Sequence, residues 1–292
     1  MSTTNTSSIK TIVQLPLFED KTILPTNKFH VSYSEVSDWM DCSFRHKLKH
    51  VLKISMEEND GSIHTSFGKA IHDAIEKYLT SKVPMNSDDA IVEFKKLVAE
   101  LHVAPTEKDV LDFSSNLPDM IGQVPDWLEE TFPGWKTVAA EFPLFESVDK
   151  QPNINFKGFI DAIISVPKKR GGGREYWILD WKTCSWGWKT EQKQKYQKQL
   201  QLMLYKHYFC QLMKVDLKDV KCGFVLIKRV APKTRKPGDR LELVPVSVGP
   251  KAIEKAQATL HEMINRVKGG FASKNRMSCE PFCPYLHTEH CR

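Results

Sequence analysis

Two short apolar runs, Gly158-Phe159-Ile160-Asp161-Ala162-Ile163 and Ile178-Leu179-Asp180-Trp181-Lys182-Thr183, decide the fold of this chain. Both are rich in the β-branched and aromatic residues that favour strands, and each has an aspartate near its centre. An unpaired carboxylate in an apolar strand costs several kcal/mol of free energy. We therefore expect a cation or hydrogen-bond donors beside both Asp161 and Asp180.

Lys182 is the first candidate for that cation. Side chains alternate across a strand, so Asp180 and Lys182 should point to one face and Trp181 to the other. Two carboxylates and a lysine suit metal-assisted phosphodiester hydrolysis, because oxygen ligands hold Mg²⁺ or Mn²⁺ while the lysine positions water or stabilises developing charge. A plain aspartate–lysine ion pair on an edge strand would use the same residues, and both interpretations stay open.

The hydrophobic pattern around these runs switches between helical and strand periodicity. A capping-box pattern at Ser32 and Glu35 opens the first of four predicted helices, at about residues 33–48, 67–79, 191–213 and 250–269. Strands are predicted at residues 137–148, 154–166, 176–183, 220–230 and 241–248. The order helix, three strands, helix, strand predicts an α/β fold with helices packed on a mixed sheet.

We expect one folded domain with one loose end. A chain of 292 residues can bury about three quarters of the surface that its unfolded form exposes, so its core needs no disulfide bonds. Residues 1–30, which are polar and rich in Ser and Thr, are predicted as a flexible extension, and residues 31–292 as the domain. Within it, residues 84–135 are predicted as a helical insertion.

Membrane and secreted classes do not fit this composition. No run approaches the roughly 18 consecutive apolar residues that a membrane-spanning helix needs, and the N-terminus lacks a basic region followed by an apolar stretch. The sequence therefore predicts a cytoplasmic protein without a membrane partner. In a reducing compartment, cysteines are normally free thiols, metal ligands or nucleophiles, so their positions are informative.

Four motifs occur in sequence order: Gly68-Lys69-Ala70-Ile71-His72, Gly158-Phe159-Ile160-Asp161, Leu179-Asp180-Trp181-Lys182 and Gln201-Leu202-Met203-Leu204-Tyr205. In order and approximate spacing they resemble the RecB-like branch of the PD-(D/E)xK nucleases, over about residues 32–292. The resemblance extends to the CRISPR-associated and phage-encoded RecB-like exonucleases and to the nuclease domain of AddB. It implies a restriction-endonuclease-like core that carries the predicted insertion.

The resemblance also implies a metal site. His72, Asp161 and Asp180 would bind Mg²⁺ or Mn²⁺, the main-chain carbonyl of Trp181 would be a further ligand, and Lys182 would be the catalytic lysine. An imidazole ligand suits Mn²⁺ better than Mg²⁺. A single histidine on a helix is more often structural, so His72 is a candidate ligand only in the company of the other motifs.

The substrate side is implied at Gln201 and Tyr205, which are four residues apart and share one face of the predicted helix. Positive charge gathers around them. The whole chain has a formal net charge of +6, but residues 186–240 hold 14 basic and 4 acidic residues, which leaves −4 for the rest. This basic stripe with its interleaved aromatic rings (Trp186, Trp188, Tyr196) predicts a single-strand DNA channel, although a solvated surface and ordinary packing would also explain it.

Three of the seven cysteines lie in the last 14 residues, at Cys279, Cys283 and Cys291. Cys42, in the first predicted helix, matches the place of the fourth cysteine in the resembled nucleases, where such a set holds a 4Fe–4S cluster. The spacing Cys-x3-Cys-x7-Cys is looser than usual in that family. Zinc, with His287 or His290 as alternative ligands, and free thiols therefore stay open. The remaining cysteines are expected to be buried core residues.

Together these features predict a Mg²⁺- or Mn²⁺-dependent deoxyribonuclease, an exonuclease in prokaryotic or phage DNA processing, recombination or repair. The alternative is a non-catalytic DNA-binding or assembly subunit that retains the fold. Buried carboxylates that repel phosphate disfavour that alternative. An RNA-directed nuclease is a third option. The expected partner is DNA, and the protein could form a homo-oligomer or join recombination proteins.

Overall fold

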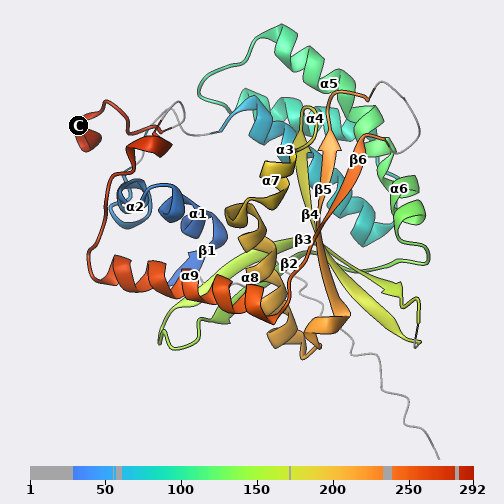
Figure 1. Cartoon of the computed structure of the whole chain (residues 1–292). Coiled ribbons are helices and arrows are strands. Elements are labelled where there is room, and N and C mark those ends of the chain that lie inside the picture. Colours follow the sequence, from blue (N-terminus) through green and yellow to red (C-terminus); the bar gives the residue numbers. More distant parts are fainter. Residues whose placement is uncertain (1–28, 55, 57–60, 171, 233–238, 280–282) are drawn as a thin grey trace, which may run out of the picture.

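A mixed sheet with helices on both faces forms the centre of the computed structural model, which describes residues 29–54, 56, 61–170, 172–232, 239–279 and 283–292 (Figure 1). The sheet has six strands, and the order β1-β3-β4-β5-β6 runs along it, with β2 paired to the other edge of β3. The extension predicted for residues 1–30 lies outside the described residues except for its last two, and His30 already belongs to a strand.

An antiparallel meander forms the middle of the sheet. Its three strands are β2 (Lys136–Ser147), β3 (Asn155–Pro167) and β4 (Arg174–Cys184). β5 (Val220–Lys228) runs parallel to β4, and β6 (Leu241–Val246) pairs antiparallel with β5. The short strand β1 (His30–Ser32), which the sequence did not predict, runs parallel to the start of β3. The mixed sheet confirms the predicted α/β class.

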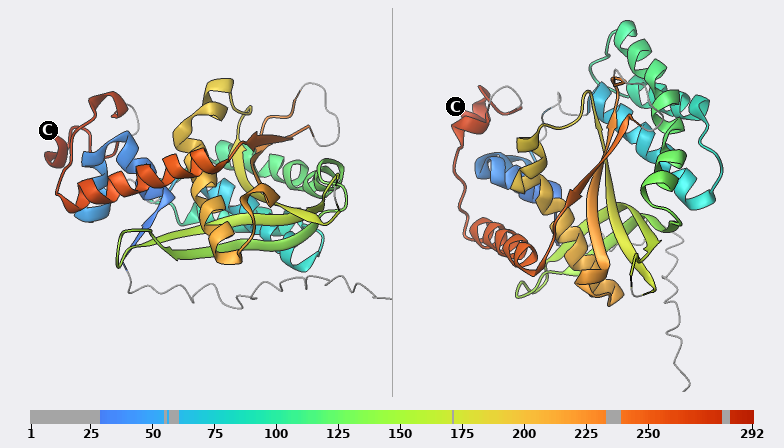
Figure 2. Two further views of the ribbon diagram at one scale, coloured as in Figure 1. Left: turned by 60° about the horizontal axis from the view of Figure 1, so that its bottom comes forward. Right: turned by 45° about the vertical axis from the view of Figure 1, so that its right-hand side comes forward.

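One hydrophobic core lies on each face of the sheet. On one face, the core includes residues of α1 (Tyr33–Asp41), α8 (Tyr196–Met213) and α9 (Pro250–Lys268). On the other face, α3 (Ile63–Ser81) packs with the three helices of the predicted insertion, α4 (Ser87–Ala99), α5 (Glu107–Gly122) and α6 (Val124–Thr131). The right-hand view of Figure 2 shows these two layers on opposite sides of the strands.

Two predicted helices are interrupted. The helix expected at 33–48 breaks at Cys42, whose extended backbone separates α1 from the short α2 (Ser43–His46) and a π-helical turn, η2 (Lys47–Val51). The helix expected at 191–213 breaks at Lys195, which leaves a separate α7 (Thr190–Gln194). Helical periodicity continues across both breaks, so the pattern did not reveal them. At the first break, the thiol of Cys42 caps α2 by accepting from the amide of Arg45.

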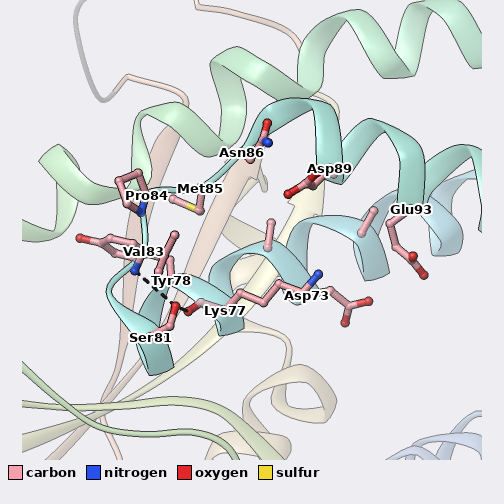
Figure 3. Close-up of a pocket in the computed structure, with 13 residues that line it drawn as sticks. Asp73, Lys77, Tyr78, Ser81, Val83, Pro84, Met85, Asn86, Asp89 and Glu93 are labelled. Carbon is pink, nitrogen blue, oxygen red and sulfur yellow. Dashed lines mark hydrogen bonds between the residues drawn. The ribbon is translucent and has the colours of Figure 1, made fainter.

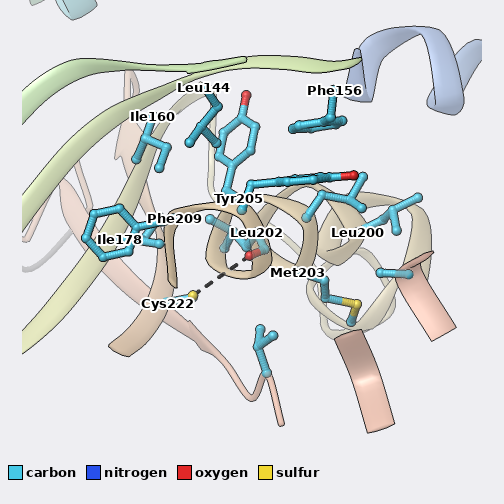
Figure 4. Packing of buried hydrophobic residues seen from close by; sticks show 14 of the residues in the cluster. Leu144, Phe156, Ile160, Ile178, Leu200, Leu202, Met203, Tyr205, Phe209 and Cys222 are labelled. Atoms are coloured by element: carbon cyan, nitrogen blue, oxygen red, sulfur yellow. Dashed lines mark hydrogen bonds between the residues drawn. The ribbon is translucent and has the colours of Figure 1, made fainter. Parts of the chain in front are cut away.

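The buried face of α8 fits closely against β3. The ring of Tyr208 stacks on Phe156 with centroids 4.6 Å apart. Tyr205 lies beside Phe156 (Figure 4), with 6.3 Å between the ring centroids. A Cβ atom at Gly158 would lie only 2.7 Å from Cε1 of Tyr205. Residue 158 must therefore lack a side chain for α8 to pack this closely on the strand.

We predict that Gly158→Ala lowers the free energy of unfolding by about 1–3 kcal/mol, because the buried Tyr205 ring would have to move. The matched control is Gly122→Ala, where an added Cβ would meet no atom within 4 Å. Chemical denaturation of both variants tests the prediction. If the two variants have the same free energy of unfolding, the Tyr205 ring does not prevent a side chain at residue 158.

Candidate active site

β3 has an unpaired stretch on one edge, and the predicted site lies beside it. Along that edge, β1 pairs with residues 155–157 and β4 pairs with residues 162–167. The intervening residues 158–161 pair with neither strand, because β4 diverges from β3 there. We call this stretch of β3 the notch. The backbone hydrogen-bonding edge that is open at the notch leaves room for side chains and for a ligand.

Asp161 lies at the end of the notch and connects the elements around it. Its Oδ2 atom accepts a hydrogen bond of 2.8 Å from the amide of Trp181 on β4. His72 on α3 places Nδ1 3.6 Å from the same oxygen, and its Nε2 lies 3.0 Å from the carbonyl oxygen of Trp181. Since a carbonyl only accepts, Nε2 must donate, and Nδ1 of the neutral ring keeps its lone pair for a ligand.

Glu141 is a candidate ligand that the sequence reasoning missed. Its carboxylate forms, with His72 and Asp161, a set of donor atoms that lie within 4.8 Å of one another. Glu141 sits on β2 opposite Asp161, between the pairs Ala140–Ala162 and Phe142–Ile160. Its φ of 47° is unusual for a non-glycine strand residue and carries strain of about 1–3 kcal/mol. A carboxylate inside the predicted apolar strand 137–148 was the available signal.

Asp180 and Lys182 share one face of β4, as the strand alternation predicted. Nζ of Lys182 lies 2.7 Å from Oδ2 of Asp180, whose side chain is only 1% exposed. Oδ1 of Asp180 has no hydrogen-bond partner among the described residues, and Oδ2 is close to Lys182 without hydrogen-bond alignment. Trp181 is buried in the opposite core. A buried oxygen that lacks a partner suits a bound cation.

Burial and neighbouring charge set the protonation states here. Burial, followed by the negative charge of Asp180, raises the pKa of Asp161 well above its usual value. Burial alone would lower the pKa of Lys182, but the carboxylates of Asp180 and Asp161 outweigh it and raise that pKa. Burial also lowers the pKa of His72. The lysine is therefore a stable cation, and the imidazole tends to be neutral, as a metal ligand must be.

The hard oxygens of two or three carboxylates together with one imidazole form a donor set that fits Mg²⁺ or Mn²⁺. Asp180 does not belong to the set of three donors within 4.8 Å, where Glu141 stands instead. Its charge nevertheless acts on both Asp161 and His72. Asp180 as a ligand stays a prediction, as does the Trp181 carbonyl, which here accepts from His72.

Two hollows open beside the site. One, of about 540 Å³, is lined by His72, Glu141 and Thr183 together with residues of α3. The other, of about 400 Å³, is lined in part by Gln201 and Tyr205, which the sequence had placed on the substrate side. Nε2 of Gln201 donates to the hydroxyl of Tyr205 at 3.3 Å. The predicted pair therefore lies together beside the notch, and both side chains are largely buried.

A larger hollow, of about 590 Å³, lies elsewhere, between α3 and the start of α4 (Figure 3). Lys77, Tyr78 and Ser81 of α3 line it, and Ser81 accepts a hydrogen bond from the amide of Val83. Asp73 lines this hollow as well as the one at the site, whereas His72 lines only the latter. None of the predicted ligands reaches the larger hollow.

The aromatic rings of the basic stripe have different surroundings. Trp188 packs on Phe224 and lies under the ammonium of Lys198, 4.0 Å from the ring centroid. The hydroxyl of Tyr196 lies 2.8 Å from that of Thr259 on α9. Trp186, in contrast, is 77% exposed just beyond the end of β4. The packing interpretation therefore holds for Trp188 and Tyr196, and Trp186 is the ring available for stacking.

The two predicted parts of the cysteine set meet in space. The C-terminal segment lies next to α2 (Figure 1), and Oγ of Ser43 accepts from the amide of Ser273 at 2.8 Å. Burial and then the nearby thiols of Cys283, Cys42 and Cys291 raise the pKa of Cys279. Residues 280–282 lie outside the described residues.

Cys42 is both an acceptor and a donor of hydrogen bonds. Its Sγ accepts from the amides of Arg45 and Asn275, each at 3.4 Å, and its thiol donates to the carbonyl oxygen of Ser273 at 3.7 Å.

The chain belongs to the PD-(D/E)XK nuclease superfamily, whose sequence profile matches residues 30–291. A solved structure of a protein assigned as an exonuclease, from Eubacterium rectale, is similar to it with a TM-score of 0.54. The alignment covers 93% of each chain at 10% sequence identity, so this likeness speaks for the fold alone. A search of curated proteins found no match. None of the described helices has the length and apolar character to cross a bilayer.

We predict that Glu141→Gln weakens Mn²⁺ binding by at least about tenfold, because the amide has lost the charge of a ligand that faces Asp161. Glu146→Gln on the same strand is the matched control, since Glu146 lies five residues away from the donor set. Titration calorimetry measures both affinities. Unchanged Mn²⁺ affinity in Glu141→Gln would exclude Glu141 from the metal site.

Proposed function

We propose that this nuclease is a Mg²⁺- or Mn²⁺-dependent deoxyribonuclease of the RecB-like branch, an exonuclease that acts on DNA ends or single strands in prokaryotic or phage DNA processing. The observation that carries the proposal is the gathering of His72, Glu141, Asp161, Asp180 and Lys182 around the notch. A cytoplasmic location, a homo-oligomer and association with recombination proteins are further parts of this proposal.

His72, Asp161 and Glu141 would hold the metal, with Asp180 and the Trp181 carbonyl as further ligands. When bound, such an ion neutralises the scissile phosphate and acidifies a water molecule. The protein fixes its ligands in advance, because Asp161 is held by the amide of Trp181 and His72 by its carbonyl. Ligands that need no rearrangement lose little entropy when the substrate binds.

Lys182 would act as a fixed positive charge. The carboxylates of Asp180 and Asp161 raise the pKa of Lys182, which favours its protonated form. Its ammonium, held 2.7 Å from Asp180, stabilises the negative charge that develops on the phosphate and orients the attacking water. Asp180 thus has two roles, as a candidate ligand and as the residue that holds the lysine in place.

A non-catalytic DNA-binding subunit is the alternative. Its affinity for DNA would be independent of divalent metal, and no cleavage would follow when metal is added. The buried carboxylates disfavour it, because without a cation they repel phosphate and cost free energy. Parallel cleavage assays on RNA and DNA of the same sequence would identify an RNA substrate.

We expect Lys182→Ala to lower kcat for DNA hydrolysis in Mn²⁺ by about 10²- to 10³-fold, the usual effect of losing one charge-stabilising group. The control is Lys221→Ala on the neighbouring strand, where the lysine pairs with Glu175 away from the site. A labelled single strand reports the rate, and thermal unfolding checks that each variant is folded. Wild-type cleavage by Lys182→Ala would refute the site.

We further propose that Cys42, Cys279, Cys283 and Cys291 bind a 4Fe–4S cluster, with zinc as the alternative. The contact between Cys42 and the C-terminal segment, and the thiols of Cys283, Cys42 and Cys291 near Cys279, support a shared ligand set. Its role would be structural, because phosphodiester hydrolysis transfers no electrons. The cluster would clamp α2 to the C-terminal segment.

Anaerobically purified protein should therefore show broad absorption at the blue end of the visible spectrum, and Cys279→Ser should lose it together with thermal stability. Cys210→Ala is the control, because Cys210 is a buried core residue on α8. Iron and zinc analysis of the same samples distinguishes the two metals. A colourless wild-type protein would rule out the cluster.

A further inference from the structure

The hollow of about 400 Å³ at the notch is built from four elements that come from three separate parts of the sequence. His30 and Ser32 come from β1, Ser34 from α1, Lys157 from β3, and Gln201 with Tyr205 from α8. We call it the anion pocket. Because β1 ends its pairing with β3 at Lys157, the pocket occupies the first part of the notch, and Asp161 lies at the other end.

The ionisable side chains among the described lining residues are those of His30, Lys157 and tyrosines. Among the residues that the structure describes, no aspartate or glutamate lines the anion pocket, whereas Asp73, Glu76 and Glu141 line the hollow on the α3 side of the site. Lys157 is the lysine among the described lining residues, and it forms no salt bridge with a carboxylate in the part of the chain that the structure describes. Ser32 and Ser34, whose hydroxyl oxygens lie 2.9 Å apart, add donors beside it. Such a lining favours an anion over a cation.

Buried amide and hydroxyl groups complete the pocket. Gln201 is 9% exposed and Tyr205 6%, yet both line the hollow, and they contact each other at 3.3 Å. The close approach of Tyr205 to Gly158 places the ring against the floor of the notch. These groups are held by the core, so the pocket is formed before any ligand arrives.

The anion pocket lies close enough to the metal site for one DNA strand to reach both. Lys157 is four residues before Asp161 on one extended strand, which separates their Cα atoms by roughly 13 Å. The side chain of Tyr205 is close enough for the charges of Asp180 and Asp161 to act on it. A DNA strand whose scissile phosphate lies at the metal site would place a second phosphate, a few nucleotides away, at this pocket.

We propose that the anion pocket binds a second phosphate of the DNA strand, a few nucleotides from the scissile one, and that Lys157 is its main charged contact. This inference deepens the proposed function and rests on it. The phosphate is either the monoester at a strand end or an internal diester, and both offer anionic oxygens to a lysine and two hydroxyls. Lys157 is thus a positioning residue that fixes where along the strand cleavage occurs.

The test measures binding separately from cleavage. Fluorescence anisotropy in EDTA gives the affinity of the wild-type protein and of Lys157→Gln for short single strands that carry a 5′-phosphate, a 3′-phosphate or only hydroxyl ends. Lys157→Arg keeps the charge, and Ser34→Ala removes one donor with little risk to folding, because Ser34 is exposed. Lys136→Gln, an exposed lysine at the far end of the same hairpin, is the matched control.

We expect Lys157→Gln to weaken binding about tenfold. The slope of log K against log salt concentration should become shallower by about 0.7, which is the share of one phosphate contact on a single strand. Lys157→Arg should retain most of the affinity, and Lys136→Gln should match the wild type. A loss confined to strands with one phosphorylated end assigns the pocket to a terminal monoester. An equal loss on all strands assigns it to an internal phosphate, and either result supports the proposal.

Two outcomes would overturn the inference. In the first, Lys157→Gln binds every DNA strand with the same affinity as Lys136→Gln. In the second, Lys157→Gln loses affinity, but the salt dependence of binding does not change. Steady-state cleavage in Mn²⁺ supplies the second readout, where Lys157→Gln should raise KM far more than it lowers kcat. A failure of the proposed function looks different. In that case no strand is cleaved by the wild type, while the Lys157-dependent binding in EDTA persists.

Discussion

The hydrogen bond from the amide of Trp181 to the carboxylate of Asp161 is the contact on which the site depends. β3 can pair with only one strand at a time along a given edge, and that edge passes from β1 to β4 with the notch between them. The bond holds β4 to β3 where their ladder has ended. It thereby keeps the notch open while fixing the distance between the two aspartate-bearing strands.

Burial then explains why these residues need one another. Asp180 is almost fully buried, and Lys182 offsets its charge, while Asp161 is held by a backbone amide and faces Glu141 and His72. These carboxylates are buried and repel each other. Burial and the charge of Asp180 therefore raise the pKa of Asp161. A divalent cation bound among these carboxylates would relieve that repulsion. The strained backbone of Glu141 fits the same pattern, since strain of this kind gathers at functional sites.

Particular residues show how far the sequence could predict the structure. The alternation of Asp180, Trp181 and Lys182 predicted their faces correctly, because a strand has a period of two in any surroundings. The helix break at Cys42 was missed, because local periodicity continues through it and contacts with residues 273–275 are what fix the extended backbone. Glu141 was missed for a related reason. Its partner across the sheet is 20 residues away in sequence, and only the register of β2 with β3 sets them opposite each other.

The sequence by itself determined the α/β class, the approximate positions of β2 to β6 and the residues of the four motifs, because periodicity and residue type are local properties. Only the tertiary structure decided the surroundings of particular side chains: Glu141 in the donor set, Trp188 and Tyr196 in the packing, Trp186 in solvent, and Lys157 in the lining of the same hollow as Gln201. Those outcomes depend on strand register and on where β1 gives way to β4 along β3. Such long-range pairings are selected by the free energy of the whole core, which no short window of sequence contains.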